Sequence, residues 1–270
     1  VRGTGQACAA IDPPPILLLS ALMGISAQFK LSGVYTRVAL ALTGLLARPR
    51  LFLAALMAAA ALLSALLTND IICLVFTPIL CAAILEARLN PVPFLIGLAA
   101  ASNIGSAATI IGNPQNMLLG QVARIDFLYF LGACIVPVLV SLAGAYAILL
   151  WLYRRQVPAG HDPGRPRERS YAAFSGHQTA KGAVVVAVLL SMFFTRVPRE
   201  VSAIALAGLL LCSRRMKTRS LLGLVDWQLL ILFMGLFVVN HALQETGLPD
   251  RIVADVADAG VYLQDPATLF

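Results

Sequence analysis

Eight long apolar stretches constrain the fold of this chain most strongly. They cover residues 15–29, 51–67, 71–85, 92–101, 127–153, 182–195, 200–212 and 221–243. Their length and uniformity are typical of membrane-embedded helices, because strands of a half-buried sheet would alternate polar and apolar residues. Only 12% of the residues are charged, against about 25% in soluble domains. We therefore predict an all-α, multi-pass integral membrane protein.

The basic residues of the chain lie mainly in short loops between the apolar stretches. The formal net charge is +7, but in such loops positive charge orients a membrane protein, so we predict no nucleic-acid partner. The five cysteines show no CxxC or His–Cys spacing. The sequence therefore predicts neither a disulfide framework nor a metal site built on thiolates, and no cofactor.

Residues 51–85 are too long for one membrane span and too short for two. As a single helix they would extend about 50 Å, against a hydrocarbon core of about 30 Å. Each half, on either side of Thr68, Asn69 and Asp70, is shorter than the roughly 20 residues of a full span. We therefore predict a re-entrant hairpin whose tip, formed by these three residues, is buried within protein.

The distribution of charge supports this topology. If 51–85 returns to its own side, 15 of the 20 lysines and arginines lie on one face, and the other five are Arg2, Arg124, Arg196, Arg199 and Arg251. The face with more lysine and arginine should be the cytoplasmic one. We expect the membrane to be the cytoplasmic membrane of a bacterium. The cytoplasmic face also holds residues 156–181, a polar stretch rich in proline, glycine and arginine that we predict to be a linker. We expect His161 and His177 to be solvated loop side chains there.

A weak internal match relates residues 10–38 to residues 224–253 at an offset of 214 positions. The pairs are Asp12 with Asp226, Gly33 with Gly247 and Arg37 with Arg251. An odd number of predicted crossings separates the two copies, so the second is inverted relative to the first, as in many secondary transporters. We accordingly expect a first repeat over 1–155, the linker over 156–181, and connecting helices with an incomplete second repeat over 182–270. On this basis we expect the chain to be part of a longer protein.

Polar residues and glycines interrupt what would otherwise be a plain span over residues 92–123. They are Ser102, Asn103, Gly105, Gly112, Asn113, Pro114, Gln115 and Asn116. Glycine weakens a helix and proline removes an amide donor, so we predict a helix broken between about 103 and 116. The freed oxygen atoms suit a small cation, and the N-terminus of the resumed helix suits an anion. The alternative is that these residues only pack helices together.

Asp70 would place an ionised carboxylate within the membrane. Insertion scales assign such a residue a cost of roughly 2.5–3.5 kcal/mol, and such residues are usually functional. Asp70 would bind a cation, carry a proton, or do each in turn. Thr68, Asn69 and Asp70 could also cap the second helix of the hairpin, because all three residue types are common at N-caps.

The pairing of TNDIICLVFTPIL (68–80) with SNIGSAATIIGNPQNMLLG (102–120) resembles the anion permeases of the ion transporter superfamily, which have a citrate-transporter-like domain. Their relatives include divalent anion:sodium symporters and the arsenite and sodium/proton antiporter permeases. The resemblance covers essentially the whole chain. It implies two inverted repeats, each with a re-entrant hairpin and a broken helix, with cations at the hairpin tips and the substrate between them.

The resemblance also implies a set of binding residues. For the ion and the substrate these are Thr68, Asn69, Asp70, Asn103, Gly105, Thr109, Gly112, Asn113, Pro114 and Asn116, of which Thr68, Asn69, Asp70, Asn103 and Gly105 would hold Na⁺. Asp70 stands where the dicarboxylate symporters have threonine in a Ser-Asn-Thr motif. This fixed negative charge favours proton coupling or cation antiport over sodium-coupled dicarboxylate uptake.

Three functions follow from these features. The first is a secondary active permease that moves a small anion across the membrane, coupled to Na⁺ or H⁺. The second is a Na⁺/H⁺ antiporter in which Asp70 exchanges the two cations. The third, a membrane enzyme, would need a constellation such as HExxH, GxSxG or paired carboxylates, which the sequence lacks. The expected partners are a small anion and the lipid bilayer, with a second copy of the chain as an alternative means of completing the site.

Overall fold

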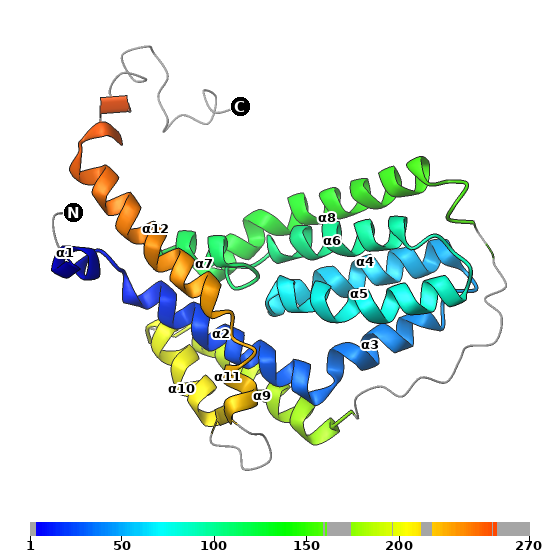
Figure 1. The fold of residues 1–270 in the computed structure, drawn as a ribbon, viewed down its shortest axis with the longest axis horizontal. Coiled ribbons are helices and arrows are strands. Elements are labelled where there is room, and N and C mark those ends of the chain that lie inside the picture. The colour runs from blue at the N-terminus through cyan, green and yellow to red at the C-terminus, as the bar shows by residue number, and fades with distance from the viewer. Residues whose placement is uncertain are drawn as a thin grey trace. The chain divides into compact units, whose positions relative to one another are not determined.

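The computed structural model describes residues 4–158, 160, 174–195, 197–211, 218–249 and 251–252. Every regular element in this part of the chain is a helix (Figure 1). The chain divides into two compact units, one formed by residues 17–225 and the other by residues 1–16 with 226–270.

The long helices overlap the predicted apolar stretches, whereas α3 (Val34–Thr43) lies outside all eight of them. The smaller unit contains α1 (Thr4–Ala9), α12 (Trp227–Glu245) and the start of α2 (Pro13–Ser32). The remaining helices are α3 (Val34–Thr43), α4 (Pro49–Leu66), α5 (Asn69–Glu86), α6 (Val92–Ser106), α7 (Pro114–Val122), α8 (Phe127–Leu152), α9 (Gly176–Met192), α10 (Arg199–Leu211) and α11 (Thr218–Leu222).

Five of the described helices, α2, α4, α5, α8 and α12, are long and apolar enough to cross a membrane. The longest, α8, has 26 residues and extends about 39 Å at 1.5 Å per residue. It begins directly after Asp126, whose side chain accepts hydrogen bonds from the backbone amides of Leu128 and Tyr129. The prediction of an all-α, multi-pass membrane protein is therefore confirmed.

Helices α4 and α5 form a helical hairpin, in which Leu67 and Thr68 make the connection (Figure 1). Each helix has 18 residues and extends about 27 Å, so the hairpin is about 12 Å shorter than α8. Pro49 fits the first turn of α4, where no amide donor is needed.

Hydrogen bonds join the end of the hairpin opposite its tip to the last turns of α8 and to the segment that follows α8. Arg50 Nε donates to the Val157 carbonyl at 3.4 Å, and the Tyr146 hydroxyl donates to the Arg50 carbonyl at 3.2 Å. The Asn90 side chain, which follows α5, donates to Gln156 Oε1. These contacts bring together the same basic loops that the charge distribution assigns to one face.

A second set of contacts joins the loops at the opposite end of the same unit. Arg199 donates to the carbonyl of Gly120 at 3.5 Å and to that of Ile125. The ring of Phe127 lies 5.9 Å from that of Phe193. The loop before α8 therefore lies beside the start of α10, and these segments contain Arg124 and Arg199, two of the basic residues assigned to the other face.

The internal match of the sequence has a counterpart in the backbone. Gly33 and Gly247, which the offset pairs, have φ angles of 79° and 65° and are the glycines with positive φ in the described residues. They closely follow α2 and α12, so the two long apolar helices end at glycines of the same conformation. The inverted orientation of the second copy stays a prediction, because α12 and most of α2 belong to different units.

The predicted linker at 156–181 lies largely outside the described residues. His161 is among the residues that are not described. His177 is exposed as expected, but it lies in the first turn of α9 and not in a loop, because that helix begins at Gly176.

Candidate functional site

The closed end of the hairpin lies against the interruption between α6 and α7. Helix α6 continues to Ser106 and α7 begins at Pro114, so the break is shorter than the predicted range of about 103–116. Asn103 and Gly105 are thus within the last turn of α6.

Two residues of extended backbone connect the helices at the tip of the hairpin. Leu67 has ψ 170° and Thr68 has ψ 126°. Thr68 occupies the N-cap position of α5, yet its side chain makes no capping hydrogen bond. Its backbone amide instead donates to Ser26 Oγ of α2 at 3.1 Å. The predicted capping by the Thr68 side chain is therefore not what holds the tip in place.

Four hydrogen bonds attach the tip to α6 and to the interruption. Asn69 Nδ2 donates to Asn103 Oδ1 at 3.3 Å, and Ser102 Oγ donates to the Asn69 carbonyl at 3.2 Å. The hydroxyls of Ser64 and Ser102 are 2.7 Å apart. Thr109 Oγ1 donates to the carbonyl of Ala65 in the last turn of α4. Thr68, Asn69, Asn103 and Thr109, which lie far apart in the sequence, are thereby gathered in one place.

Gly105 allows α6 and α4 to approach each other closely. A Cβ atom at this position would lie 2.3 Å from the Ala61 Cα atom and 2.4 Å from the Ala61 carbonyl oxygen. The Gly105 carbonyl accepts a hydrogen bond from the Ala108 amide at 3.1 Å. The structure therefore gives Gly105 a packing role, and its contact with an ion stays a prediction.

The residues of the resumed helix bind the interruption itself. Asn113 caps α7 by accepting from the Asn116 amide at 2.8 Å, and Asn113 Nδ2 donates to Ser106 Oγ at 3.1 Å. Asn116 Nδ2 donates to the carbonyls of Ser106 and Thr109 at 3.3 and 3.0 Å. Gly112 lies so near Ser106 that a Cβ atom would be 2.2 Å from its carbonyl oxygen. These side chains therefore hold the backbone of the interruption in place. Pro114 lies in the first turn of α7.

Asp70 and Asn103 are exposed, and Asn69 is half-buried. Asp70 lies in the first turn of α5, where the partial positive charge of the helix N-terminus favours a carboxylate. It starts a stripe of exposed positions along α5 that continues at steps of four residues through Leu74 and Pro78 and resumes at Leu85, seven residues further on. The site therefore opens onto the exposed face of this helix.

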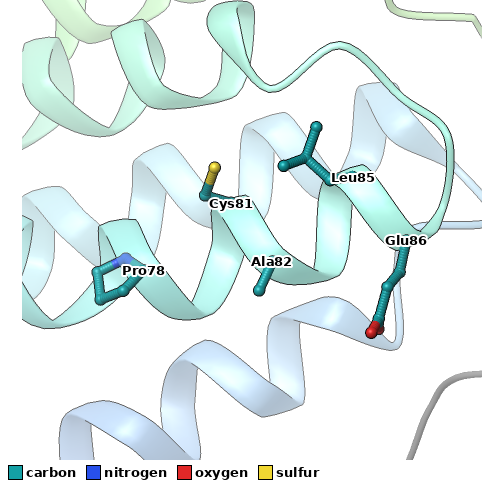
Figure 2. A pocket seen from close by; sticks show the side chains of 5 residues that line it. All are labelled: Pro78, Cys81, Ala82, Leu85 and Glu86. Carbon is teal, nitrogen blue, oxygen red and sulfur yellow. The ribbon is translucent and has the colours of Figure 1, made fainter.

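Figure 2 shows the other end of that face. Pro78, Cys81, Ala82, Leu85 and Glu86 line an open pocket, with Cys81 and Leu85 toward one edge of the helix face and Ala82 and Glu86 toward the other. The pocket is largely apolar, so it offers none of the amide groups found at the hairpin tip. We place the candidate site at the tip and not at this pocket.

The chemistry of the site is that of neutral oxygen and nitrogen groups with one carboxylate. Asp70 is the one charged residue in the predicted set. The described residues contain no group of three or more histidine, cysteine, aspartate or glutamate side chains that could hold a metal ion. A monovalent cation here would rely on the Asp70 carboxylate, on amide oxygens and on backbone carbonyls.

Sequence reasoning missed Ser26 and Ser64 and left Ser102 out of the predicted set. All three are fully buried and hold the hairpin tip through their hydroxyls. Single serines are common in apolar helices as packing residues. Their contact with the tip depends on tertiary structure, so no local signal could have identified them.

Comparisons with known proteins agree with this structure. The family model described as "Citrate transporter" matches residues 1–269. An uncharacterized transporter of Mycobacterium tuberculosis is 30% identical over 251 residues, which are 90% of this chain and 59% of that protein. A silicon efflux transporter of Oryza sativa subsp. japonica is 34% identical over 160 residues, or 59% of this chain and 33% of its own length.

An arsenical pump membrane protein of Escherichia coli is 26% identical over 238 residues, or 83% of this chain and 55% of that protein. The chain thus spans about 59% of the length of the mycobacterial relative. The names of these relatives are those of transporters and pumps, and none is that of an enzyme.

Proposed function

Since the chain belongs to the citrate transporter family, we propose that the protein is a secondary active permease that moves a small anion, coupled to Na⁺ or H⁺. The predicted family is thereby confirmed: the chain belongs to a family of membrane transporters, not of enzymes. The observation that carries the finer proposal is the attachment of the hairpin tip to the helix interruption through Asn69 and Asn103.

The electrostatics of the junction suit a pair of oppositely charged ligands. Four helix ends meet there: the C-termini of α4 and α6 and the N-termini of α5 and α7. Carbonyl groups at helix C-termini favour a cation, whereas amides at N-termini favour an anion. We propose that a coupling ion and an anionic substrate occupy neighbouring positions at this junction.

The depth of the junction supports the same proposal. The hairpin is about 12 Å shorter than α8, and α7 continues the 92–123 segment beyond the hairpin tip. Binding sites of secondary transporters lie near the bilayer midplane, at broken helices of this kind. We propose that the basic loops face the cytoplasm of a bacterium and that the tip lies within the bilayer.

An ion at the tip would compete for one existing hydrogen bond. Asn103 Oδ1 accepts from Asn69 at 3.3 Å, beyond the usual length of about 2.9–3.0 Å for an N–H···O bond. This long bond is easily replaced by contact of Asn103 Oδ1 with a cation. Asp70, exposed in the first turn of α5, would supply the compensating charge.

The test is transport by the full-length protein in proteoliposomes, with Na⁺ and pH gradients imposed separately. The solutes are citrate, arsenite and silicic acid, which the names of the family and of two relatives suggest. Gradient-driven uptake of citrate is expected, because arsenous and silicic acids are largely uncharged at neutral pH and serve as the neutral comparison. Uptake of none of them under either gradient would contradict the proposal.

A Na⁺/H⁺ antiporter is the second candidate, because the one charged residue of the predicted set, Asp70, is a carboxylate that could bind Na⁺ and H⁺ in turn. In that case Na⁺ would drive proton movement with no solute present. The same proteoliposomes with a pH-sensitive dye separate the two functions. A second copy of the chain that completes the site is a partner we would test by co-purification of two differently tagged copies.

A further inference from the structure

A small closed cavity lies behind the hairpin tip, among α2, the tip, the α6–α7 interruption and α9. Its wall consists of Leu22, Ile25, Ser26, Leu66, Leu67, Thr68, Ile111, Val186 and Leu189. The space open to the centre of a water molecule is about 10 Å³, which is about the minimum for one water. The cavity thus accommodates a single small molecule.

The polar groups at the wall of this cavity are incompletely paired. Thr68 is 6% exposed, and its Oγ1 atom is buried with no hydrogen-bond partner. Ser26, fully buried, accepts from the Thr68 amide at 3.1 Å, and its hydroxyl, which also lies near that of Tyr35, has a second lone pair that can accept from a water molecule. Leu66 is the last residue of α4, and carbonyls of a last helical turn have no partner inside the helix.

We propose that one ordered water molecule occupies this cavity and bonds Thr68 Oγ1, Ser26 Oγ and the C-terminal end of α4. A buried water typically makes two to four hydrogen bonds to otherwise unpaired polar groups. The three groups named here meet that requirement. The water links the hairpin tip to α2, on the side away from Asn103.

Two other occupancies fit the wall less well. A dry cavity would leave the Thr68 hydroxyl buried and unpaired, which native structures rarely tolerate. A metal cation such as Ca²⁺ takes about 6–8 oxygen ligands, whereas seven of the nine wall residues have hydrocarbon side chains. A water molecule needs fewer polar partners than a metal cation, so it suits this wall better.

The first experiment measures thermal unfolding of the full-length protein in detergent and Na⁺-free choline buffer. Thr68→Val removes the hydroxyl and keeps the shape of the side chain. If water is bound, this variant lowers Tm by about 2–4 °C, the shift expected for the loss of one hydrogen bond in a domain of this size. Thr77→Val, at an exposed position of the same helix, is the matched control and leaves Tm unchanged.

An unchanged or raised Tm in Thr68→Val would overturn the proposal, because removing an unpaired buried hydroxyl relieves a cost instead of breaking a bond. If Thr68→Val lowers Tm in NaCl but not in choline chloride, the occupant is an ion, and this result would also overturn the proposal. Neither Tm measurement depends on transport. This inference can therefore fail while the proposed function holds, and the proposed function can fail while this inference holds.

The second experiment is a structure of the full-length protein at a resolution that shows ordered water. A density peak within hydrogen-bond distance of both Thr68 Oγ1 and Ser26 Oγ, absent from the Thr68→Val protein, is expected. An empty cavity in the unmodified protein would overturn the proposal.

Discussion

Replacement of Gly105 by alanine should separate α6 from α4 and disorganise the site. The new Cβ would lie 2.3 Å from the Ala61 Cα atom, whereas carbon atoms in contact are about 3.5–4.0 Å apart. The two helices must therefore move apart by about 1 Å or more. Overpacking of this kind costs about 1–3 kcal/mol, which corresponds to a fall in Tm of about 2–12 °C.

The displacement should also reach the hairpin tip. Ser102 lies about one turn before Gly105, and its hydroxyl is 2.7 Å from that of Ser64 and 3.2 Å from the Asn69 carbonyl. An added separation of about 1 Å would lengthen these contacts beyond the hydrogen-bond range of about 3.2 Å. We therefore expect Gly105→Ala to lose transport as well as stability.

The assay is thermal unfolding of the purified full-length protein, followed by flux in proteoliposomes. Gly132→Ala is the matched control, because Gly132 is also inside a helix but has no atom within 4 Å of its built Cβ. Gly132→Ala should raise the free energy of unfolding slightly, by about 0.5–1 kcal/mol. The double variant Gly105→Ala/Ala61→Gly should not recover, since the clash is with the Ala61 backbone. Equal Tm values for Gly105→Ala and Gly132→Ala would refute the reasoning.

Three further predictions concern the hairpin and the interruption. Asn113→Ala removes the cap of α7 and the bond to Ser106, so the free energy of unfolding should fall by about 0.5–2 kcal/mol; Asn113→Ser, which can still cap, should lose less in the same denaturation experiment. Asn69→Ala should weaken binding of the coupling ion or the substrate, measured as a raised concentration for half-maximal flux, and an unchanged value would assign Asn69 to packing alone. Single cysteines introduced at residues 40–50 and 86–90 should react with a membrane-impermeant maleimide from the same side of the membrane, and labelling from opposite sides would refute the re-entrant hairpin.

The sequence predicted the helices and the two unusual segments because both depend on local chemistry. Long apolar stretches separated by basic loops define the helices, and a Thr-Asn-Asp triplet within such a stretch marks a turn. The interruption was expected from Pro114 and its neighbouring amides. The interruption begins later than predicted, because α6 continues through Asn103, whose side-chain Nδ2 donates to the Ala99 carbonyl at 3.1 Å, as far as Ser106.

The roles of individual polar residues could not be read in the same way. An asparagine in a broken helix can bind a ligand or the backbone, and the sequence does not show where its hydrogen bonds go. Asn113 and Asn116 bind the loop, and Gly105 makes room for α4. Ser26 meets Thr68 across 42 positions of the chain, a contact that only the folded structure reveals.

The role of Asp70 is the centre of the account, and its most direct test is transport by Asp70→Asn. Removal of a carboxylate within the membrane should ease insertion, so the variant should reach the membrane in normal amounts. Glu86→Gln, at the other end of the same helix, is the matched control for loss of charge. We predict that Asp70→Asn abolishes gradient-driven flux in proteoliposomes while Glu86→Gln retains it, and flux of Asp70→Asn equal to that of the unmodified protein would contradict the account.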